Sequence, residues 1–161
     1  MSKAENTNNK TTIDTVNSLF IEVFNDIVKV EQNALRSYGF EDITTTEAHT
    51  VEAIDLYGDK AMSVVASKLG ITVGTLTVSV NNLAKKGYVT RSRSAEDKRR
   101  VILTLTPKGH ELIKAHSKFH REMVKSAVLE LTENEAEIFK ASLAKLSKFF
   151  TENNKKLSSA D

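Results

Sequence analysis

The chain has 161 residues, of which 40% are hydrophobic and 27% are charged, with a net charge of +2. This length suits one compact domain, and the balance of residues is that of a folded globular protein. There is no cysteine, which excludes disulfides, thiolate metal ligands and thiol-based redox sensing. No apolar run approaches the ~20 residues that span a bilayer, and the polar opening lacks the core of a signal peptide. We therefore expect a cytoplasmic protein with no membrane partner.

The first predicted element is a long amphipathic helix. Apolar residues recur at helical spacing from Ile13 to Leu35, and Gly39 marks the end of the pattern. The preceding residues 1–12 are polar and are predicted to be a disordered tail. The apolar stripe of this helix needs a surface against which it can be buried.

Three shorter helices are predicted next. A capping box at Thr44 opens the second helix, the third covers about 63–69, and Thr72 caps a fourth helix that runs to Lys86. The third and fourth are separated by a tight turn containing Gly70. This arrangement is typical of a helix-turn-helix motif, although any two adjacent helices can produce the pattern.

A predicted β-hairpin follows the fourth helix directly. Residues 88–93 and 101–106 alternate in polarity on either side of a charged tip over 94–99. A basic hairpin in this position is typical of the wing of a winged helix-turn-helix.

Two longer helices close the predicted fold. Pro107 suits the first position of a fifth helix that reaches about residue 131, and Thr132 with Glu135 forms a capping box for the sixth. The predicted fold class is therefore mainly α with a small β-wing and six helices. Its parts are a single domain over 13–152, a winged lobe over about 44–106, dimerisation helices over about 13–38 and 107–152, and a polar tail over 153–161.

Charge is distributed unevenly along the chain. Residues 13–57 contain nine acids and two bases, whereas residues 85–108 contain eight bases and two acids. A local cationic stretch within a nearly neutral protein is typical of a nucleic-acid footprint, although such a run is also commonly a solvated surface.

The fourth helix carries the residue types of a DNA-reading surface. Leu76, Val80 and Leu83 define an inner face, so polar residues point outward. Amides can pair with adenine edges and threonine methyls can touch thymine methyls, which favours an A·T-rich site. In the wing, we expect Asp97 to orient Arg99 toward a minor groove or phosphate. The predicted DNA-binding residues are Thr72, Thr75, Thr77, Val78, Asn81, Asn82, Lys85, Arg91, Arg93, Lys98, Arg99 and Arg100.

These features together resemble the MarR family of bacterial regulators over roughly 13–150. The resemblance rests on the six-helix plan, the run Leu83-Ala-Lys-Lys-Gly-Tyr-Val89, the wing Asp97-Lys-Arg-Arg100, and Leu105-Thr-Pro-Lys-Gly109. It implies a repressor that is a homodimer through its first, fifth and sixth helices and binds a pseudo-palindromic duplex operator. The unburied apolar stripes independently require a partner.

Within the family, segments 24–35, 40–49 and 73–83 resemble the branch that represses fatty-acid synthesis genes. That resemblance implies that DNA binding requires no cofactor and is strengthened by a long-chain acyl group on acyl carrier protein. It would place an acyl slot beneath the first helix, lined by Val23, Ile27 and Val30.

The histidines allow more than one interpretation. His116 and His120 are four residues apart on the fifth helix and share a face, and His49 with Glu31 could complete a Zn²⁺ site. The set resembles the ligands of zinc-responsive members of the MarR family. A structural network joining three helices and a ligand-responsive role remain the alternatives.

Two other classes of function compete with DNA binding. The histidine set could support a metal-dependent hydrolase, but the chain has no glycine-rich phosphate loop and no Gly-x-Ser-x-Gly turn. We therefore expect that the protein is not an enzyme. A winged helix can also bind protein or RNA, but the outward amides and threonines of the fourth helix favour reading of a duplex DNA groove.

Overall fold

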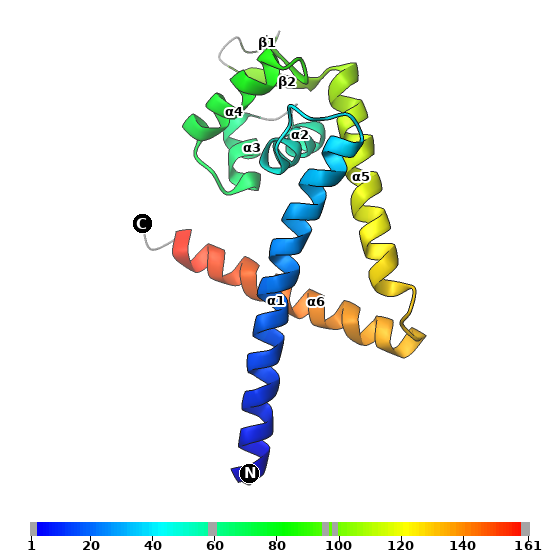
Figure 1. The fold of residues 1–161 in the computed structure, drawn as a ribbon. Coiled ribbons are helices and arrows are strands. Elements are labelled where there is room, and N and C mark those ends of the chain that lie inside the picture. The colour runs from blue at the N-terminus through cyan, green and yellow to red at the C-terminus, as the bar shows by residue number, and fades with distance from the viewer. Residues whose placement is uncertain (1–2, 58–60, 95–96, 98–99, 159–161) are drawn as a thin grey trace. The chain divides into compact units, whose positions relative to one another are not determined.

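In a computed structural model of the chain, the predicted architecture is confirmed (Figure 1). The structure describes residues 3–57, 61–94, 97 and 100–158, and for 3–10 and 154–158 only the helical backbone. The chain divides into two compact units, residues 1–119 and 120–161. The elements are α1 (Lys3–Ser37), α2 (Thr45–Tyr57), α3 (Met62–Leu69), α4 (Val73–Lys85), β1 (Val89–Arg93), β2 (Val101–Leu105), α5 (Pro107–Val128) and α6 (Glu133–Ser158).

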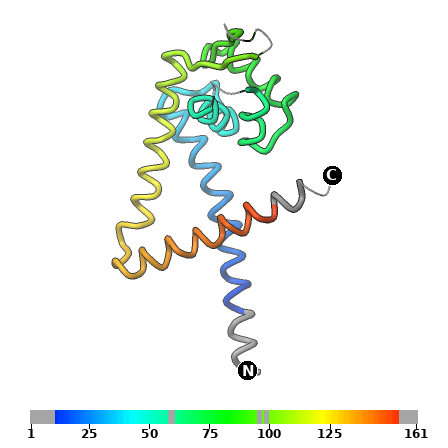
Figure 2. Tube along the Cα trace, turned by 180° about the vertical axis from the view of Figure 1, so that it is seen from behind, coloured from blue at the N-terminus to red at the C-terminus, as the bar shows by residue number. Residues whose placement is uncertain are grey.

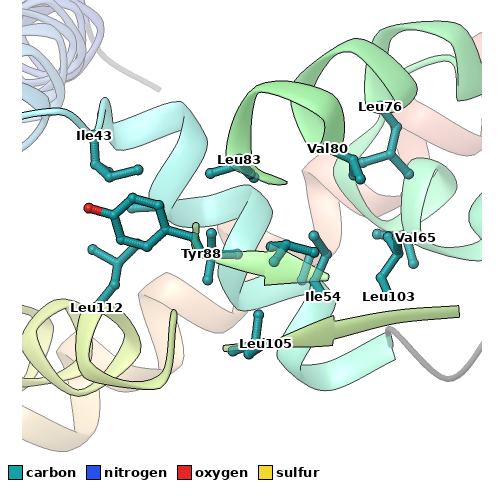
Figure 3. Packing of buried hydrophobic residues seen from close by; sticks show 14 of the residues in the cluster. Ile43, Ile54, Val65, Leu76, Val80, Leu83, Tyr88, Leu103, Leu105 and Leu112 are labelled. Atoms are coloured by element: carbon teal, nitrogen blue, oxygen red, sulfur yellow. The ribbon is translucent and has the colours of Figure 1, made fainter. Parts of the chain in front are cut away.

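The first unit has one apolar core, formed mainly by α2, α3, α4 and the β-hairpin (Figure 3). Tyr88 is fully buried in this core together with Ile43 and Leu112, so the core also includes the segment before α2 and the start of α5. Buried side chains recur every three or four residues on α2 and α4, which places them on one face of each helix. The buried cluster is Leu35, Ile43, Ala48, Val51, Ala53, Ile54, Val65, Ala66, Leu76, Val80, Leu83, Tyr88, Val89, Leu103, Leu105 and Leu112.

The helix-turn-helix is formed by α3 and α4, whose axes differ in direction by 99°. Gly70 ends α3 in the left-handed conformation at φ 66°, which glycine adopts without a Cβ clash. Thr72 then caps α4, as its side chain accepts a hydrogen bond from the Thr75 backbone N–H. The predicted turn chemistry thus sets the angle between these two helices.

The wing is an antiparallel hairpin in which Val89 pairs with Leu105 and Arg93 pairs with Val101. Val89, Leu103 and Leu105 are buried, whereas the rest of β1 is exposed. The hairpin is therefore attached to the core at its base.

Helix α1 begins earlier than the sequence analysis assigned, because it includes residues predicted to form a disordered tail. Its backbone is helical from Lys3, and Figure 2 traces it without a break from residue 11 to Ser37. Residues 3–12 contain no proline or glycine that would end a helix. The apolar periodicity locates the start of the apolar stripe rather than the start of the helix. Similarly, α6 extends past residue 153 to Ser158.

The second unit contains the end of α5 and all of α6. The predicted capping box is present, with Thr132 N–H donating to Glu135 Oε2 at 2.8 Å and Glu135 N–H donating to Thr132 Oγ1 at 3.4 Å. Large apolar side chains of α6, including Ile138, Leu143 and Phe149, are about half exposed or more in the single chain.

Within the part of the chain that the structure describes, no single helix is long and apolar enough to cross a membrane. Only α3 and α4 taken together across their bend reach that length and composition. Their apolar residues Val65, Leu76 and Val80 are buried in the protein core.

Candidate nucleic-acid interface

Helix α4 has one face held in the core and one face directed to solvent. Leu76, Val80 and Leu83 are fully buried, which fixes the rotation of the helix. The opposite face is formed by exposed residues, namely Gly74, Thr75, Val78, Asn81, Asn82 and Lys85. This is the face that the sequence assigned to a DNA groove, and its small and amide side chains suit close approach to base edges.

The hydroxyl groups of all three predicted threonines form local hydrogen bonds. Thr72 Oγ1 lies 2.9 Å from Thr75 Oγ1 while also capping the helix. Thr77 is half-buried, and its hydroxyl donates to the Val73 carbonyl at 2.8 Å. Thr72 and Thr75 are exposed to solvent, whereas Thr77 is only partly so.

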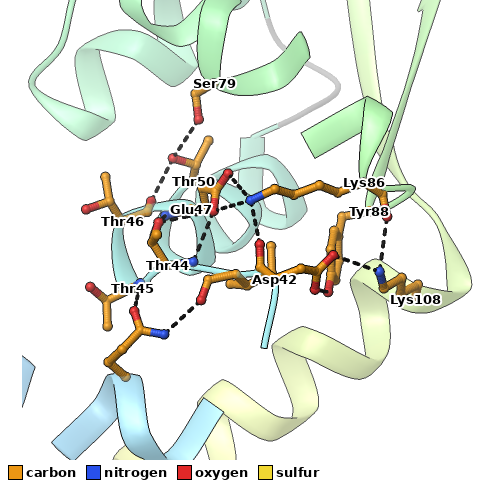
Figure 4. Close-up of polar contacts among 12 residues, drawn as sticks. Asp42, Thr44, Thr45, Thr46, Glu47, Thr50, Ser79, Lys86, Tyr88 and Lys108 are labelled. Carbon is orange, nitrogen blue, oxygen red and sulfur yellow. Dashed lines mark hydrogen bonds and ion pairs between the residues drawn. The ribbon is translucent and has the colours of Figure 1, made fainter. Parts of the chain in front are cut away.

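A surface hollow lies between the start of α2 and the exposed face of α4. It brings residues from two segments of the chain to one side of α4, the helix that we call the recognition helix. Its lining is Thr44, Thr46, Glu47, Gly74, Thr75, Val78, Ser79, Asn82 and Lys86. Figure 4 shows the Ser79 side chain directed toward Thr50 on α2, and the two hydroxyl oxygens lie 3.5 Å apart.

The wing contributes exposed cations close to α4. Arg91 and Arg93 are exposed on β1, and the Arg91 Nη1 group donates a hydrogen bond to Asn81 Oδ1. Arg100 is also exposed, and its backbone N–H donates to the Asp97 carbonyl at 2.9 Å. The predicted contacts of Lys98 and Arg99 lie outside the described residues.

A polar network beneath the recognition helix uses two lysines of the cationic stretch (Figure 4). Lys86 Nζ contacts both carboxylate oxygens of Glu47, at 2.7 and 2.8 Å. Lys108 Nζ lies 3.2 Å from Asp42 Oδ2, and the Tyr88 hydroxyl donates to Asp42 Oδ1 at 2.6 Å. Lys86 and Lys108 therefore have acidic partners within the protein, although the Lys108 side chain is still 46% exposed.

The electrostatics of this network follow from its contacts. The hydrogen bond from Tyr88, followed by the interaction with Lys108, lowers the pKa of Asp42. Burial alone would raise the pKa of Glu47, but hydrogen bonds from Lys86 and Thr44 outweigh burial and lower it. Burial and the bond to Asp42 raise the pKa of the Tyr88 hydroxyl well above its usual range. At neutral pH these groups form two ion pairs and a neutral phenol.

Sequence reasoning did not identify this network. Lys86 and Glu47 are 39 residues apart, and Lys108 and Asp42 are 66 apart. The capping box at Thr44 did identify Glu47, and that cap is present, with the Thr44 N–H donating to Glu47 Oε2 at 3.0 Å. The second role of Glu47, as partner of Lys86, depends on tertiary packing.

A separate cluster of acid and histidine side chains joins α1, α2 and α5 in the first unit. Glu31 and His116 are buried, and Glu31 Oε1 lies 2.7 Å from His116 Nε2. The same oxygen lies 3.4 Å from Nε2 of His49, whose ring meets that of His116 edge-on at 4.9 Å. His120 is half-buried one turn further along α5, where the second unit begins.

Glu52 is a member of this cluster that sequence reasoning missed. Its Oε2 lies 3.7 Å from His49 Nδ1 and 4.0 Å from His116 Nδ1. The available signal was its place three residues after His49 on the same helix. Two imidazoles with two carboxylates are a donor set that suits a divalent metal ion and equally a structural network.

The predicted acyl-slot residues lie on α1. Val23 and Val30 are 53% exposed in the single chain, and Ile27 is half-buried.

A helix-turn-helix followed directly by a cationic wing, with an outward face of amides and threonines, defines a DNA-binding transcriptional regulator. Comparison with known proteins agrees: residues 41–100 match the MarR family model. FabT of Streptococcus pneumoniae, solved in complex with DNA, is 35% identical with a TM-score of 0.83, over 87% of this chain and 98% of that one. The chain belongs to the MarR family.

Other relatives support the same assignment. MepR of Staphylococcus aureus, also solved in complex with DNA, is 26% identical with a TM-score of 0.67, over 82% of this chain and 94% of that one. The transcriptional regulator SarZ of Staphylococcus saprophyticus is 28% identical over 115 residues, which are 71% of this chain and 77% of SarZ.

Proposed function

We propose that this MarR-family protein is a homodimeric repressor of fatty-acid synthesis genes whose DNA binding is strengthened by long-chain acyl-acyl carrier protein. The observation that carries the proposal is the likeness to FabT, which extends over nearly the whole of that protein. The sequence segments that resemble the fatty-acid branch of the family lie in α1, in α4, and in the first turn of α2 with the residues just before it. The described surface of α4 suits an A·T-rich duplex.

The homodimer is supported by the exposed apolar residues of α1. Ile13, Val16, Phe20 and Phe24 are each about half exposed or more in the single chain. A stripe of this length on an isolated surface is unfavourable in water, and a second copy would bury it. A two-fold dimer places its recognition helices about one helical turn apart, so half-sites should be about 10 base pairs apart, centre to centre.

An acyl slot beneath α1 would couple the effector to DNA binding. Val23, Ile27 and Val30 offer apolar surface there, and each buried methylene contributes about 0.8 kcal/mol. The affinity of the acyl carrier complex should therefore increase steeply with chain length. Arg36 and Lys118 are exposed cations that could meet an acidic carrier, and the Lys118 ammonium lies 5.2 Å from the centre of the Tyr38 ring.

A zinc-responsive repressor is the second candidate, favoured by the cluster of Glu31, His49 and His116. The ligand atoms of these residues lie within 4.8 Å of one another. The residues fit a Zn²⁺ ion, with neutral imidazoles and carboxylates as ligands. Bound zinc would cross-link α1, α2 and α5.

One experiment separates these candidates. Binding to duplex DNA from the promoter of a fatty-acid synthesis gene is titrated with acyl carrier protein carrying short or long acyl chains, and separately with Zn²⁺. Tightening that increases with chain length supports the proposal. Tightening by zinc alone, with loss of the response in His49→Ala, would establish the second candidate; His49 is chosen because its side chain is 46% exposed.

A further inference from the structure

The contact between Arg91 and Asn81 links the wing to the recognition helix. Arg91 lies on β1 and Asn81 on the outward face of α4, and both side chains are exposed. The Arg91 Nη1 group donates to Asn81 Oδ1. Because a guanidinium has only donors, the carbonyl oxygen of the amide must face the arginine. The amide nitrogen of Asn81 then points away from Arg91.

This orientation changes what Asn81 can recognise. An unrestrained asparagine reads adenine with both amide atoms, since Oδ1 accepts from N6 and Nδ2 donates to N7. When Oδ1 is held by Arg91, the amide offers its N–H donors to the groove. Donors match acceptor edges, which in the major groove are guanine O6 and N7, adenine N7 and thymine O4.

We propose that Arg91 and Asn81 act as one specificity-determining pair, in which Arg91 is a positioning residue that makes Asn81 a donor toward an acceptor edge of a base. The proposal deepens the proposed function, because it rests on DNA binding by α4. It also assigns Arg91 a role different from that of its neighbour Arg93, for which contact with phosphate is the ordinary role of a wing cation.

The two roles differ in a measurable way. A cation that contacts phosphate strengthens binding to every duplex, whereas an arginine that orients an amide strengthens binding only to the duplex with the matching base. Arg93 lies two residues from Arg91 on β1, is exposed and has the same charge. It is therefore a matched control.

The test begins with a duplex selected by the wild-type homodimer from a randomised library, together with a scrambled duplex of equal length. Dissociation constants for both are measured at one salt concentration for Arg91→Met, Asn81→Ala, the double variant and Arg93→Met. The specificity ratio is the dissociation constant for the scrambled duplex divided by that for the selected duplex. We expect Arg91→Met to lower this ratio by about tenfold, which is the discrimination typical of one well-placed base contact. Arg93→Met should weaken both complexes to a similar extent. In the Asn81→Ala background, Arg91→Met should leave the ratio almost unchanged.

A repeated selection with Asn81→Asp tests the donor directly. The carboxylate still pairs with Arg91 but offers acceptors only, so the preferred base at one position in each half-site should change to cytosine or adenine, which present amino groups.

Two results would overturn the pair. In the first, Arg91→Met weakens binding to the selected and scrambled duplexes equally. In the second, Arg91→Met lowers the ratio as much in the Asn81→Ala background as in the wild-type protein. If the wild-type protein selects no consensus at all, the proposed function itself fails. Circular dichroism and thermal unfolding, which should be unchanged for these exposed positions, exclude misfolding as the cause of any loss.

Discussion

The Glu47 carboxylate has two partners, and both stabilise its ionised form. It caps α2 through Thr44 and pairs with Lys86. Asp42 is stabilised in the same sense by Tyr88 and Lys108. The ion pair of Glu47 with Lys86 therefore links the start of α2 to the C-cap residue of α4.

The lowered pKa values of Glu47 and Asp42 predict a loss of stability in acid. Their ordinary values are 4.5 and 3.8, and both are lower in the folded protein. The stabilisation is complete above the ordinary values and is lost as the pH falls through them toward the folded values. Glu47→Gln should therefore reduce the difference in unfolding free energy between about pH 6 and about pH 3, measured by urea denaturation. Glu137→Gln, which removes an exposed pair with Lys140, should not. An unaltered acid dependence in Glu47→Gln would contradict the role of this carboxylate.

The same contacts predict which cations determine the salt dependence of DNA binding. Arg93 is exposed on the wing, whereas Lys108 is held by Asp42 and lies 4.1 Å from the centre of the Tyr88 ring. Each phosphate contact contributes about 0.9 to the slope of log K against log salt. Arg93→Gln should reduce the magnitude of the slope by about 0.9, the value of one phosphate contact, and Lys108→Gln should leave the slope nearly unchanged. Equal changes of slope would show that Lys108 is also part of the DNA footprint.

At the scale of elements, α5 begins against the backbone of the two residues that precede β1. Thr106 Oγ1 donates to the Gly87 carbonyl at 2.6 Å and accepts from the Gly109 N–H at 3.1 Å, while the Thr106 N–H donates to the Tyr88 carbonyl at 3.0 Å. These bonds cap α5 and bring its first turn close to the chain entering β1. The close approach leaves no space for a side chain at Gly109.

We predict that Gly109→Ala destabilises the protein. A Cβ at this position would lie 2.3 Å from the Tyr88 carbonyl oxygen and 3.3 Å from Leu105 Cβ, so the backbone would have to move. Overpacking of this kind costs about 1–3 kcal/mol. Gly74→Ala is the control, because its Cβ would meet only Thr72 Oγ1 at 3.7 Å, an ordinary van der Waals contact. Chemical denaturation of both variants measures the difference. Equal stability of the two would contradict the close contact.

The boundaries of most elements were predictable because local chemistry sets them. Thr72, Gly70 and the capping box at Thr132 act within a few residues of their own positions, and the structure confirms each. The start of α1 was not predictable from periodicity, since a polar helix leaves no apolar stripe. The grouping of Glu31, His49 and His116 was predicted only from helical spacing and a family resemblance. Their distances depend on how three helices pack.

The candidate DNA-binding site shows the same division between local and tertiary effects. The outward face of α4 followed from the buried spacing of Leu76, Val80 and Leu83. The pairing of Lys86 with Glu47 did not follow, because counting charges along a chain does not show which of them meet. The contact of Arg91 with Asn81 joins a strand to a helix and was likewise invisible in the sequence.

At the scale of the whole molecule, each unit leaves apolar side chains exposed. On α1, Phe24 is 64% exposed, and on α6, Leu143 is 49% exposed. Exposed apolar residues that recur along one helix differ from the single scattered apolar residues of an ordinary monomer surface. A homodimer that buries them would also fix the distance between two recognition helices, which is what an inverted repeat requires.

The dimer can be tested by placing a charge in each apolar surface. Burying a phenylalanine or leucine contributes about 1.5–3 kcal/mol, and a buried unpaired carboxylate costs more, so Phe24→Glu or Leu143→Glu should raise the dimer dissociation constant by at least about tenfold. Glu22→Gln on α1 changes an exposed polar residue and should leave the constant unaltered. Sedimentation equilibrium measures the constant, and circular dichroism checks that the helices persist. Because a monomer engages only one half-site, binding to a duplex with two half-sites should weaken in parallel with dimer dissociation. Dimers as tight as the wild type in both charged variants would show that these stripes are covered in another way, and the proposed arrangement of the recognition helices would be wrong.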